Sequence, residues 1–329
     1  MIDFLNPAAW NAFVREESGS PLQSWEWGVF QETLGKKIVR VADDDFVALF
    51  IWQTLPFHRG YWYAPRGPVV RRNTDLGNVF EKFRRKSAER LAKEPERAIS
   101  IRVEPDYMNA PEASTALQAL GFTKANPVQP HETRILDLKN PEVQLLKEME
   151  HDTRYAIRTA ERRSITVRLI SDKHDKQNAF DVFWDLFEET AKRHDLKNYP
   201  ENYYRELFAL YGDLKTVVAA SYLEKTPINA SIILLFGKEA IYLYSASRTG
   251  YGRYNAPSLA LWKAIQFAKA DGRTKFDLWG VSREKSGWKG ITSFKEGFGG
   301  TQIREPGAWD YPINKFFYHL YRSLTKLPH

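Results

Sequence analysis

The chain of 329 residues contains no cysteine, which excludes disulfide bonds, thiolate metal ligands and a cysteine nucleophile. Long apolar runs are also missing: a stretch such as IILLF at 232–236 has the length of a strand, far below the ~20 residues of a membrane span. The N-terminal stretch MIDFLNPAAWNAFVREE lacks the basic segment and apolar core of a signal peptide. From these absences we expect a cytoplasmic protein.

Common catalytic and nucleotide-binding signatures are absent as well. The sequence has no G-x-x-x-x-G-K-[ST] loop, no G-x-G-x-x-G turn, no H-E-x-x-H pair and no G-x-S-x-G elbow. The simplest nucleotide, metal and serine-hydrolase interpretations are therefore removed. We expect neither a metal ion nor a bound cofactor.

The charge that is present is positive. Lys and Arg number 48 against 41 Asp and Glu, which gives a net charge of +7. This balance favours nucleic acid, phosphorylated metabolites or an anionic membrane surface as partners. Two basic tracts, at 80–93 and 154–163, would serve as phosphate contacts for RNA. Solvated helix faces explain the tracts equally well, because glutamates alternate there with the cations.

The two halves of the sequence repeat one order of elements. Each half predicts a buried strand, a turn, an aromatic strand, a basic loop, an amphipathic helix and a closing strand. The strands and helices are expected at 47–55, 61–70, LGNVFEKFRRKSAERLAK and AISIRVEP in the first half, and at 229–237, 240–247, LALWKAIQFAKADG and KFDLWGV in the second. The pattern predicts an α/β (α+β) fold with a mixed β-sheet flanked by helices in each half.

The predicted domain boundary falls near residue 139. The first domain is expected at 1–138 with the C-terminal tail 306–329 returning to it, and the second at 139–305. Between a strand and a helix of the second half, the stretch SASRTGYGRYNAPS occupies the place of the phosphate-binding turn of GNAT acyltransferases. It keeps Gly250 and Gly252 but lacks the leading Arg or Gln. The order of elements therefore agrees with a GNAT-like topology, whereas the CoA-binding turn is incomplete.

Several landmarks occur in a characteristic order between residues 22 and 300. They are LQSWEWGVFQETLG, YAPRGPVV, IRVEP, HDTRYAIRTAERRSITV, YLYSASRTGYGRYNAPS and SFKEGFGG. In these the chain resembles the Fem family of aminoacyltransferases (FemA/FemX type), which use aminoacyl-tRNA to extend the peptide stem of peptidoglycan precursors. The resemblance implies two GNAT-like domains that share a cleft.

The resemblance also implies catalytic residues. The family's F-K-x-x-F-G segment places Phe294 at a substrate contact and Lys295 where a cation stabilises the tetrahedral oxyanion of ester aminolysis, an effect of ~3 to 4 kcal/mol for one good donor. The glycines after Lys295 predict an exposed turn with room for an RNA terminus, and an ordinary hairpin with a solvated lysine is the alternative. Glu104 occupies the family's acidic position and would accept the proton of the attacking amine. A structural ion pair of Glu104 with Arg102 or a lysine is equally open.

Tyr203, Tyr242 and Tyr244 match family positions that line the precursor-binding cleft. For Tyr242 and Tyr244, alternating aromatics on a strand are as often simply core.

The chain departs from the family at the precursor diphosphate. The lysine and the arginine that clamp this group fall on Gln31 and Tyr199, so Lys197, Lys36 or Lys37 would have to substitute. A nucleotide-linked acceptor is therefore in doubt, and a lipid-linked or different acceptor is favoured.

We accordingly expect a metal-free aminoacyltransferase that moves an amino acid from aminoacyl-tRNA to an amine of a peptidoglycan precursor stem peptide. The expected partners are aminoacyl-tRNA and a lipid-linked or UDP-linked muropeptide, with peripheral membrane contact left open. Two alternatives remain: an N-acyltransferase of GNAT-like fold that uses acyl-CoA or another activated donor, and a non-catalytic tRNA-binding protein.

Overall fold

The computed structural model describes residues 6–72, 74–105, 110–172, 175–194, 198–285 and 287–325. The chain forms two compact units, one of residues 1–131 with 304–329 and one of residues 132–303. The chain therefore leaves unit 1 after His131 and returns to it at Arg304. The domain limits expected from sequence, 1–138 with 306–329 and 139–305, stay a prediction.

Unit 1 contains one mixed sheet. Its strands follow the order β1 (Ile38–Asp43), β2 (Phe46–Leu55), β3 (Arg59–Ala64), β5 (Arg97–Val103), β14 (Ala308–Pro312) and β6 (Thr123–Ala125), and β4 (Val69–Val70) pairs with β2. The first three strands form an antiparallel meander, β5 runs parallel to β3, and β14 runs antiparallel to β5. The C-terminal segment thus supplies an interior strand of this sheet.

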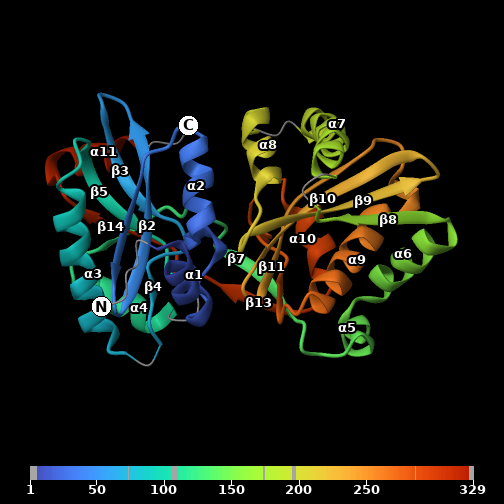
Figure 1. Cartoon of the computed structure of the whole chain (residues 1–329), viewed down its shortest axis with the longest axis horizontal. Helices are drawn as coiled ribbons and strands as arrows, with labels where there is room; N and C mark the ends of the chain where they lie inside the picture. Colours follow the sequence, from blue (N-terminus) through green and yellow to red (C-terminus); the bar gives the residue numbers. More distant parts are fainter. Residues whose placement is uncertain are drawn as a thin grey trace. The chain divides into compact units, whose positions relative to one another are not determined.

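Helices cover both faces of the unit 1 sheet. The helices α3 (Leu76–Leu91) and α4 (Ala110–Ala119) lie opposite α1 (Pro7–Glu16) and α2 (Trp25–Thr33), and α11 (Lys315–Thr325) packs on β5 (Figure 1). Asp75 caps α3 by accepting a hydrogen bond from the Asn78 amide at 2.9 Å. Phe80 and Phe83 of α3 then pack with Phe46 of β2 in one buried cluster.

Unit 2 contains a second mixed sheet. Its strands follow the order β13 (Thr301–Arg304), β7 (Glu132–Asp137), β12 (Lys275–Asp277), β11 (Glu239–Ser247), β10 (Thr226–Phe236), β9 (Lys215–Leu223) and β8 (Ile165–Ile170). Strands β8 to β11 are antiparallel, β12 runs parallel to β11, and β7 runs antiparallel to β12. The pairings β9-β10-β11-β12-β7 therefore repeat those of β1-β2-β3-β5-β14 in unit 1, and β8 is an additional edge strand.

The helices of unit 2 divide between the two faces of its sheet. Helices α5 (Glu142–Glu148), α6 (His151–Arg162) and α9 (Ala256–Ala270) lie on one face, and α7 (Lys176–His194) and α8 (Glu201–Ala209) on the other (Figure 1). The α9 sequence is mainly apolar, and nine of its fifteen residues are buried. A wide apolar face favours an interior position, and α9 packs between the sheet and α6.

The predicted repeat is confirmed in its order of elements. A meander, a helix and a parallel strand occur as β1-β2-β3-α3-β5 in unit 1 and as β9-β10-β11-α9-β12 in unit 2. The strand predicted at 61–70 is wrong in its length, because β3 ends at Ala64 and β4 pairs separately with β2. Pro65 and Pro68 lie in this stretch, and proline cannot donate to a strand ladder.

Candidate active site

Lys295 lies in the last turn of α10 (Lys289–Glu296), where its side chain is buried and only 7% exposed. The prediction of an exposed glycine-rich turn at this place is therefore wrong. The helix ends with Gly297 as its C-cap, so the run of glycines marks a helix end.

The glycines after Lys295 allow close backbone contacts. A Cβ at Gly299 would lie 2.7 Å from the carbonyl oxygen of Glu148, and a Cβ at Gly300 would lie 2.6 Å from that of Ile135. Both glycines also have positive φ, which disfavours other residues. These glycines pack the chain against neighbouring backbone of unit 2 and do not make room for an RNA terminus.

The Lys295 ammonium points at the loop that follows β12. Its Nζ donates a hydrogen bond of 2.8 Å to the carbonyl oxygen of Gly280. Burial lowers the pKa of Lys295 to about 8, and the carboxylate of Asp277 opposes this shift. An amine with a pKa near 8 remains mostly protonated at pH 7, so Lys295 is a buried cation that loses its charge under mildly alkaline conditions.

A second contact fixes α10 to the same loop. Thr292 Oγ1 donates to the Ser282 carbonyl at 2.9 Å and accepts from the Ser282 amide at 3.0 Å. The position of Lys295 is thereby held by backbone contacts one turn earlier in the helix. A cation held in this way needs little reorganisation when charge develops nearby.

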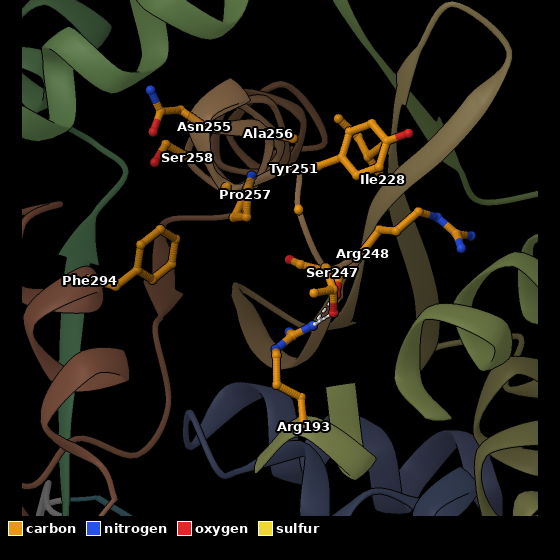
Figure 2. A pocket seen from close by; sticks show the side chains of 13 residues that line it. Arg193, Ile228, Ser247, Arg248, Tyr251, Asn255, Ala256, Pro257, Ser258 and Phe294 are labelled. Atoms are coloured by element: carbon orange, nitrogen blue, oxygen red, sulfur yellow. Dashed lines mark hydrogen bonds between the residues drawn. The ribbon is translucent and has the colours of Figure 1, made fainter. Parts of the chain in front are cut away.

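A cavity of about 420 Å³ opens beside α10 at the N-terminus of α9. Its apolar wall is formed by Ile228, Tyr251, Pro257 and Phe294, and its polar groups include Arg193, Ser247 and Ser258. Figure 2 shows Phe294 at one side of the cavity, facing Pro257 at the start of α9. The volume lies within the ~300–1,000 Å³ typical of small-ligand sites. Lys295, the neighbour of Phe294, is not among the residues that line it.

Positive charge enters the cavity from α7. Arg193 donates to the Ser247 carbonyl at 3.1 Å and to the Thr249 hydroxyl at 2.7 Å, and Figure 2 shows the bond to Ser247. Arg248 differs, because it pairs with Asp185 at 2.6 Å and points away from the cavity in Figure 2. The N-terminus of α9 adds its helix dipole. Together, Arg193 and this helix end can bind an anionic group such as a phosphate.

Glu104 is buried in unit 1 just after β5, with an exposure of 2%. One of its oxygens accepts from the Tyr63 hydroxyl at 2.5 Å, and the carboxylate also accepts from the backbone amides of Val128 and Gln129. Burial and this carboxylate raise the pKa of Tyr63 well above its usual value. Glu104 is therefore a hydrogen-bonded hub between β3, β5 and the segment at 128–129.

The ion pair considered for Glu104 forms elsewhere. Arg102 donates to both carboxylate oxygens of Asp310, at 2.7 and 2.8 Å, and joins β5 to β14. The interpretation of Glu104 as the partner of Arg102 is therefore wrong. A neighbouring buried pair, Arg66 with Glu305 at 3.1 Å, also connects the C-terminal segment to unit 1.

The tyrosines predicted to line a cleft lie on different sides of the unit 2 sheet. Tyr242 is 2% exposed in the core beneath α9, whereas Tyr244 packs against Tyr204 and Phe187 of the α7 and α8 layer. A β-bulge in β11 changes the register between these two tyrosines. Tyr203 hydrogen-bonds Tyr244, and burial raises the pKa of both hydroxyls. Only Tyr203 and Tyr244 are thus brought together.

Of the described positions considered for an acceptor diphosphate, Lys36 is an exposed lysine, whereas the others are neutral or paired. Gln31 lies in the last turns of α2, half-buried, and Tyr199 stacks on Tyr203 with ring centroids 4.1 Å apart. Lys37 pairs with Glu94 and Glu96 in unit 1. Lys197 lies outside the described residues.

Sequence reasoning missed two contributors to the candidate site. Arg193 is one of several basic residues in the last turn of α7. Cations are common at helix C-termini because they interact favourably with the helix dipole, so the sequence does not single out Arg193. Asp277 ends β12 and was indistinguishable from a solvated strand end. Within the described residues no cluster of three or more histidine, aspartate or glutamate side chains could hold a metal ion. None of the described helices combines the length and the apolar character that crossing a bilayer requires.

The two units define a class of protein, two mixed α/β units of GNAT-like fold in one chain. A crystal structure of FemX superposes with a TM-score of 0.81 and 20% identity, covering 96% of this chain and 98% of that one. A tandem GNAT protein from the clavulanic acid biosynthesis pathway superposes with a TM-score of 0.51 and 10% identity, covering 94% and 95%. At these identities the likeness concerns the fold.

The FemAB family model matches residues 5–223 and 214–326, and the chain belongs to this family. The lipid II:glycine glycyltransferase of Staphylococcus saprophyticus is 23% identical over 96% of this chain and 94% of its own length. The UDP-N-acetylmuramoylpentapeptide-lysine N(6)-alanyltransferase of Weissella viridescens is also 23% identical, over 83% of this chain and 84% of its own. With the aminoacyltransferase FemA of Staphylococcus epidermidis the match is 29% identical, and it spans 31% of this chain and only 25% of that relative.

Proposed function

We propose that this protein is an aminoacyltransferase that moves an amino acid from aminoacyl-tRNA to an amine of a peptidoglycan precursor stem peptide in the cytoplasm. Membership of the FemAB family and the names of its relatives support a transferase. The observation that carries the proposal further is the buried cation Lys295, which lies next to Phe294 of a ligand-sized cavity.

The role proposed for Lys295 is electrostatic stabilisation of the transition state. The acceptor amine attacks the aminoacyl ester carbon, the carbonyl oxygen becomes an oxyanion, and collapse of this intermediate expels the ribose hydroxyl of the tRNA. A buried ammonium has three N–H donors, and one of them is used by Gly280. In the proposed mechanism another of these donors stabilises the oxyanion, an effect of ~3 to 4 kcal/mol for one good donor.

The cavity beside α9 is proposed for the 3′ end of the donor. A terminal nucleoside offers a flat base for Phe294 or Tyr251 and phosphates for Arg193 and the α9 N-terminus. The basic tract at 154–163 on α6 is a further candidate for phosphate contacts. The tract at 80–93 is a weaker one, because Lys82 and Lys86 of α3 pair with Asp43.

For the acceptor, the proposal favours a lipid-linked precursor. The positions of Gln31 and Tyr199 lack the cations that would hold a diphosphate, and the nearby Lys37 is already paired. Glu104 is proposed as the group that accepts the proton of the attacking amine. Tyr203 and Tyr244 are proposed as contacts of the stem peptide.

The test incubates the purified protein with total charged tRNA and, in parallel, with a lipid-linked and a UDP-linked muropeptide. We expect a mass increase equal to one amino-acid residue on the lipid-linked acceptor, lost when the tRNA is deacylated beforehand. Transfer to neither acceptor, with the protein shown to bind charged tRNA, would favour the non-catalytic tRNA-binding alternative.

A second candidate function rests on the helix end at α9. A cavity with Arg193 at a helix N-terminus also suits the pyrophosphate of acyl-CoA, and the protein would then be an N-acyltransferase with that donor. Thermal stabilisation by CoA would distinguish it, since a ligand that binds the folded state raises the unfolding midpoint.

A further inference from the structure

Helix α11 exposes a stripe of large apolar side chains. Ile313, Phe316, Leu320 and Leu324, here called the α11 stripe, are 47%, 72%, 47% and 55% exposed. Phe316, Leu320 and Leu324 follow one another at intervals of four residues, which places them on one helix face, and Ile313 precedes Phe316 by three. Scattered exposed apolar residues are common, but a contiguous stripe of this kind marks an interaction site.

The opposite face of α11 anchors the helix to unit 1. Tyr318 is 1% exposed, and its hydroxyl lies 2.9 Å from that of Thr123 and 3.3 Å from Asp310. Figure 1 shows α11 against the unit 1 sheet. The stripe is thus presented by a helix that is already packed, and it is not the face that holds the helix in place.

The chain around the stripe is basic. Residues 311–325 contain Lys315, His319 and Arg322 and no Asp or Glu. Lys315 is exposed, so an apolar stripe and a cationic flank share the accessible side of the helix. This combination is the pattern of a helix that lies in the interface of a membrane with anionic lipids.

A neighbouring turn adds a second exposed aromatic. Phe57, between β2 and β3, is 85% exposed. Two residues later, Arg59 lies 3.2 Å above the ring of Phe317 and so brings the start of β3 against α11. The turn and the helix therefore offer apolar and cationic groups in the same region of unit 1.

We propose that α11 docks unit 1 onto an anionic phospholipid surface, with the α11 stripe inserted at the boundary between headgroups and acyl chains. A second copy of the chain is the less suitable occupant. A symmetric pairing would set the cationic flank against itself, and the stripe offers on the order of 400 Å², about half of the ~800 Å² that each partner buries in a stable interface.

This inference goes beyond the transfer reaction and does not depend on it. Vesicle binding is measured without tRNA or muropeptide, so failure of the proposed function leaves the result unchanged. If both hold, docking would bring the enzyme to the surface in which a lipid-linked acceptor resides.

The experiment measures flotation of the full chain with phosphatidylcholine vesicles, with and without phosphatidylglycerol. We expect the wild type to float only with the anionic vesicles, and less so as salt is raised. The double variant Phe316→Asp/Leu320→Asp should lose at least tenfold in partitioning. Val143→Asp, at an apolar residue of α5 that is 79% exposed, is the matched control and should bind like the wild type.

A milder variant guards against misfolding of the double variant. Lys315→Gln keeps the stripe intact and should weaken binding to anionic vesicles about fivefold. Three results would overturn the proposal: no flotation of the wild type, equal flotation of the wild type and the double variant, or a concentration-dependent dimer that the double variant abolishes.

Discussion

Replacing Lys295 with methionine removes the ammonium while keeping most of the side-chain volume. If this cation stabilises the oxyanion, turnover in Lys295→Met should fall by ~100-fold or more, the usual scale for the loss of one such donor. Binding of charged tRNA should change little, because Lys295 does not line the cavity and its Nζ is directed at Gly280.

The same substitution has a predictable effect on stability. The pKa of Lys295 falls from 10.5 to about 8 on folding, so the folded state holds this proton more weakly than the unfolded state. The charged form therefore destabilises the fold at every pH below about 8, by ~3 kcal/mol. Loss of the bond to Gly280 offsets part of this, ~1 to 2 kcal/mol. We expect Lys295→Met to be more stable than the wild type by ~1 to 2 kcal/mol at pH 7.

The stability advantage of Lys295→Met should disappear in a defined pH window. As pH rises from about 8 towards 10.5, the unfolded lysine loses its proton as well and the cost to the wild type disappears. Urea unfolding of both proteins at several pH values measures this. If Lys295 lay in an exposed turn, the substitution would leave the free energy of unfolding nearly unchanged at every pH.

Lys176 provides the matched control. It is 4% exposed, donates to the Leu210 carbonyl at 2.7 Å, and has its pKa lowered by burial to about 8. Lys176→Met should therefore show a similar stability change with normal turnover. Near-normal turnover of both methionine variants would refute the catalytic assignment of Lys295 and leave it as a second structural lysine.

Four further outcomes are expected. The wild-type rate should fall above pH 8 as Lys295 loses its proton, whereas Lys295→Arg should be partly active with no such fall, because guanidinium stays charged; identical pH profiles would exclude Lys295 as the titrating group. Glu104→Ala should lower the free energy of unfolding by ~1 to 3 kcal/mol more than Glu104→Gln, because it removes the acceptor of the buried Tyr63 hydroxyl proton, and equal unfolding curves would contradict this. Arg193→Ala should reduce the salt slope of tRNA binding by ~1, while Arg248→Ala, whose cation is already paired, should leave it unchanged; filter binding at several salt concentrations decides. Acetyl-CoA should give no heat of binding, and a micromolar affinity by calorimetry would replace tRNA by CoA as the donor.

The repeat of elements was predictable because its signals are local. The spacing of apolar residues predicts the strand at 229–237 and the amphipathic helix at 76–91. The order of such elements in the two halves predicts two similar sheets. The strand β14 could not be predicted. It pairs with β5 and β6, and contacts such as that of Arg102 with Asp310 join residues more than two hundred positions apart.

The surroundings of Lys295 could not be predicted either, because they also depend on contacts between residues far apart in the sequence. A glycine can serve a turn, a helix cap or a close contact, and only the approach of the Glu148 backbone to Gly299 identifies the last of these. The sequence also gives no signal for the bulge in β11, which places Tyr242 and Tyr244 on different faces of the sheet. Strict alternation would have kept the two tyrosines on one face.

The ends of the parallel strands differ between the two units, and this difference accounts for the cavity beside α9 in unit 2. In unit 1, β3 and β5 stay paired up to Ala64 and Val103, and Glu104, immediately beyond, accepts hydrogen bonds from Tyr63 and Gln129. In unit 2, β12 pairs only with the first three residues of β11, and β11 then continues to Ser247 with β10 on its other side but without β12.

The carboxyl ends of parallel neighbours are where open α/β sheets bind ligands, because the chains leaving them diverge. The early end of β12 in unit 2 leaves such an opening. The loop after β12 carries Gly280 towards Lys295, while the loop after β11 leads into α9 and forms the cavity. One repeated topology thus yields a hydrogen-bonded carboxylate in unit 1 and an open, cationic site in unit 2, which is the arrangement expected if the anionic donor binds unit 2.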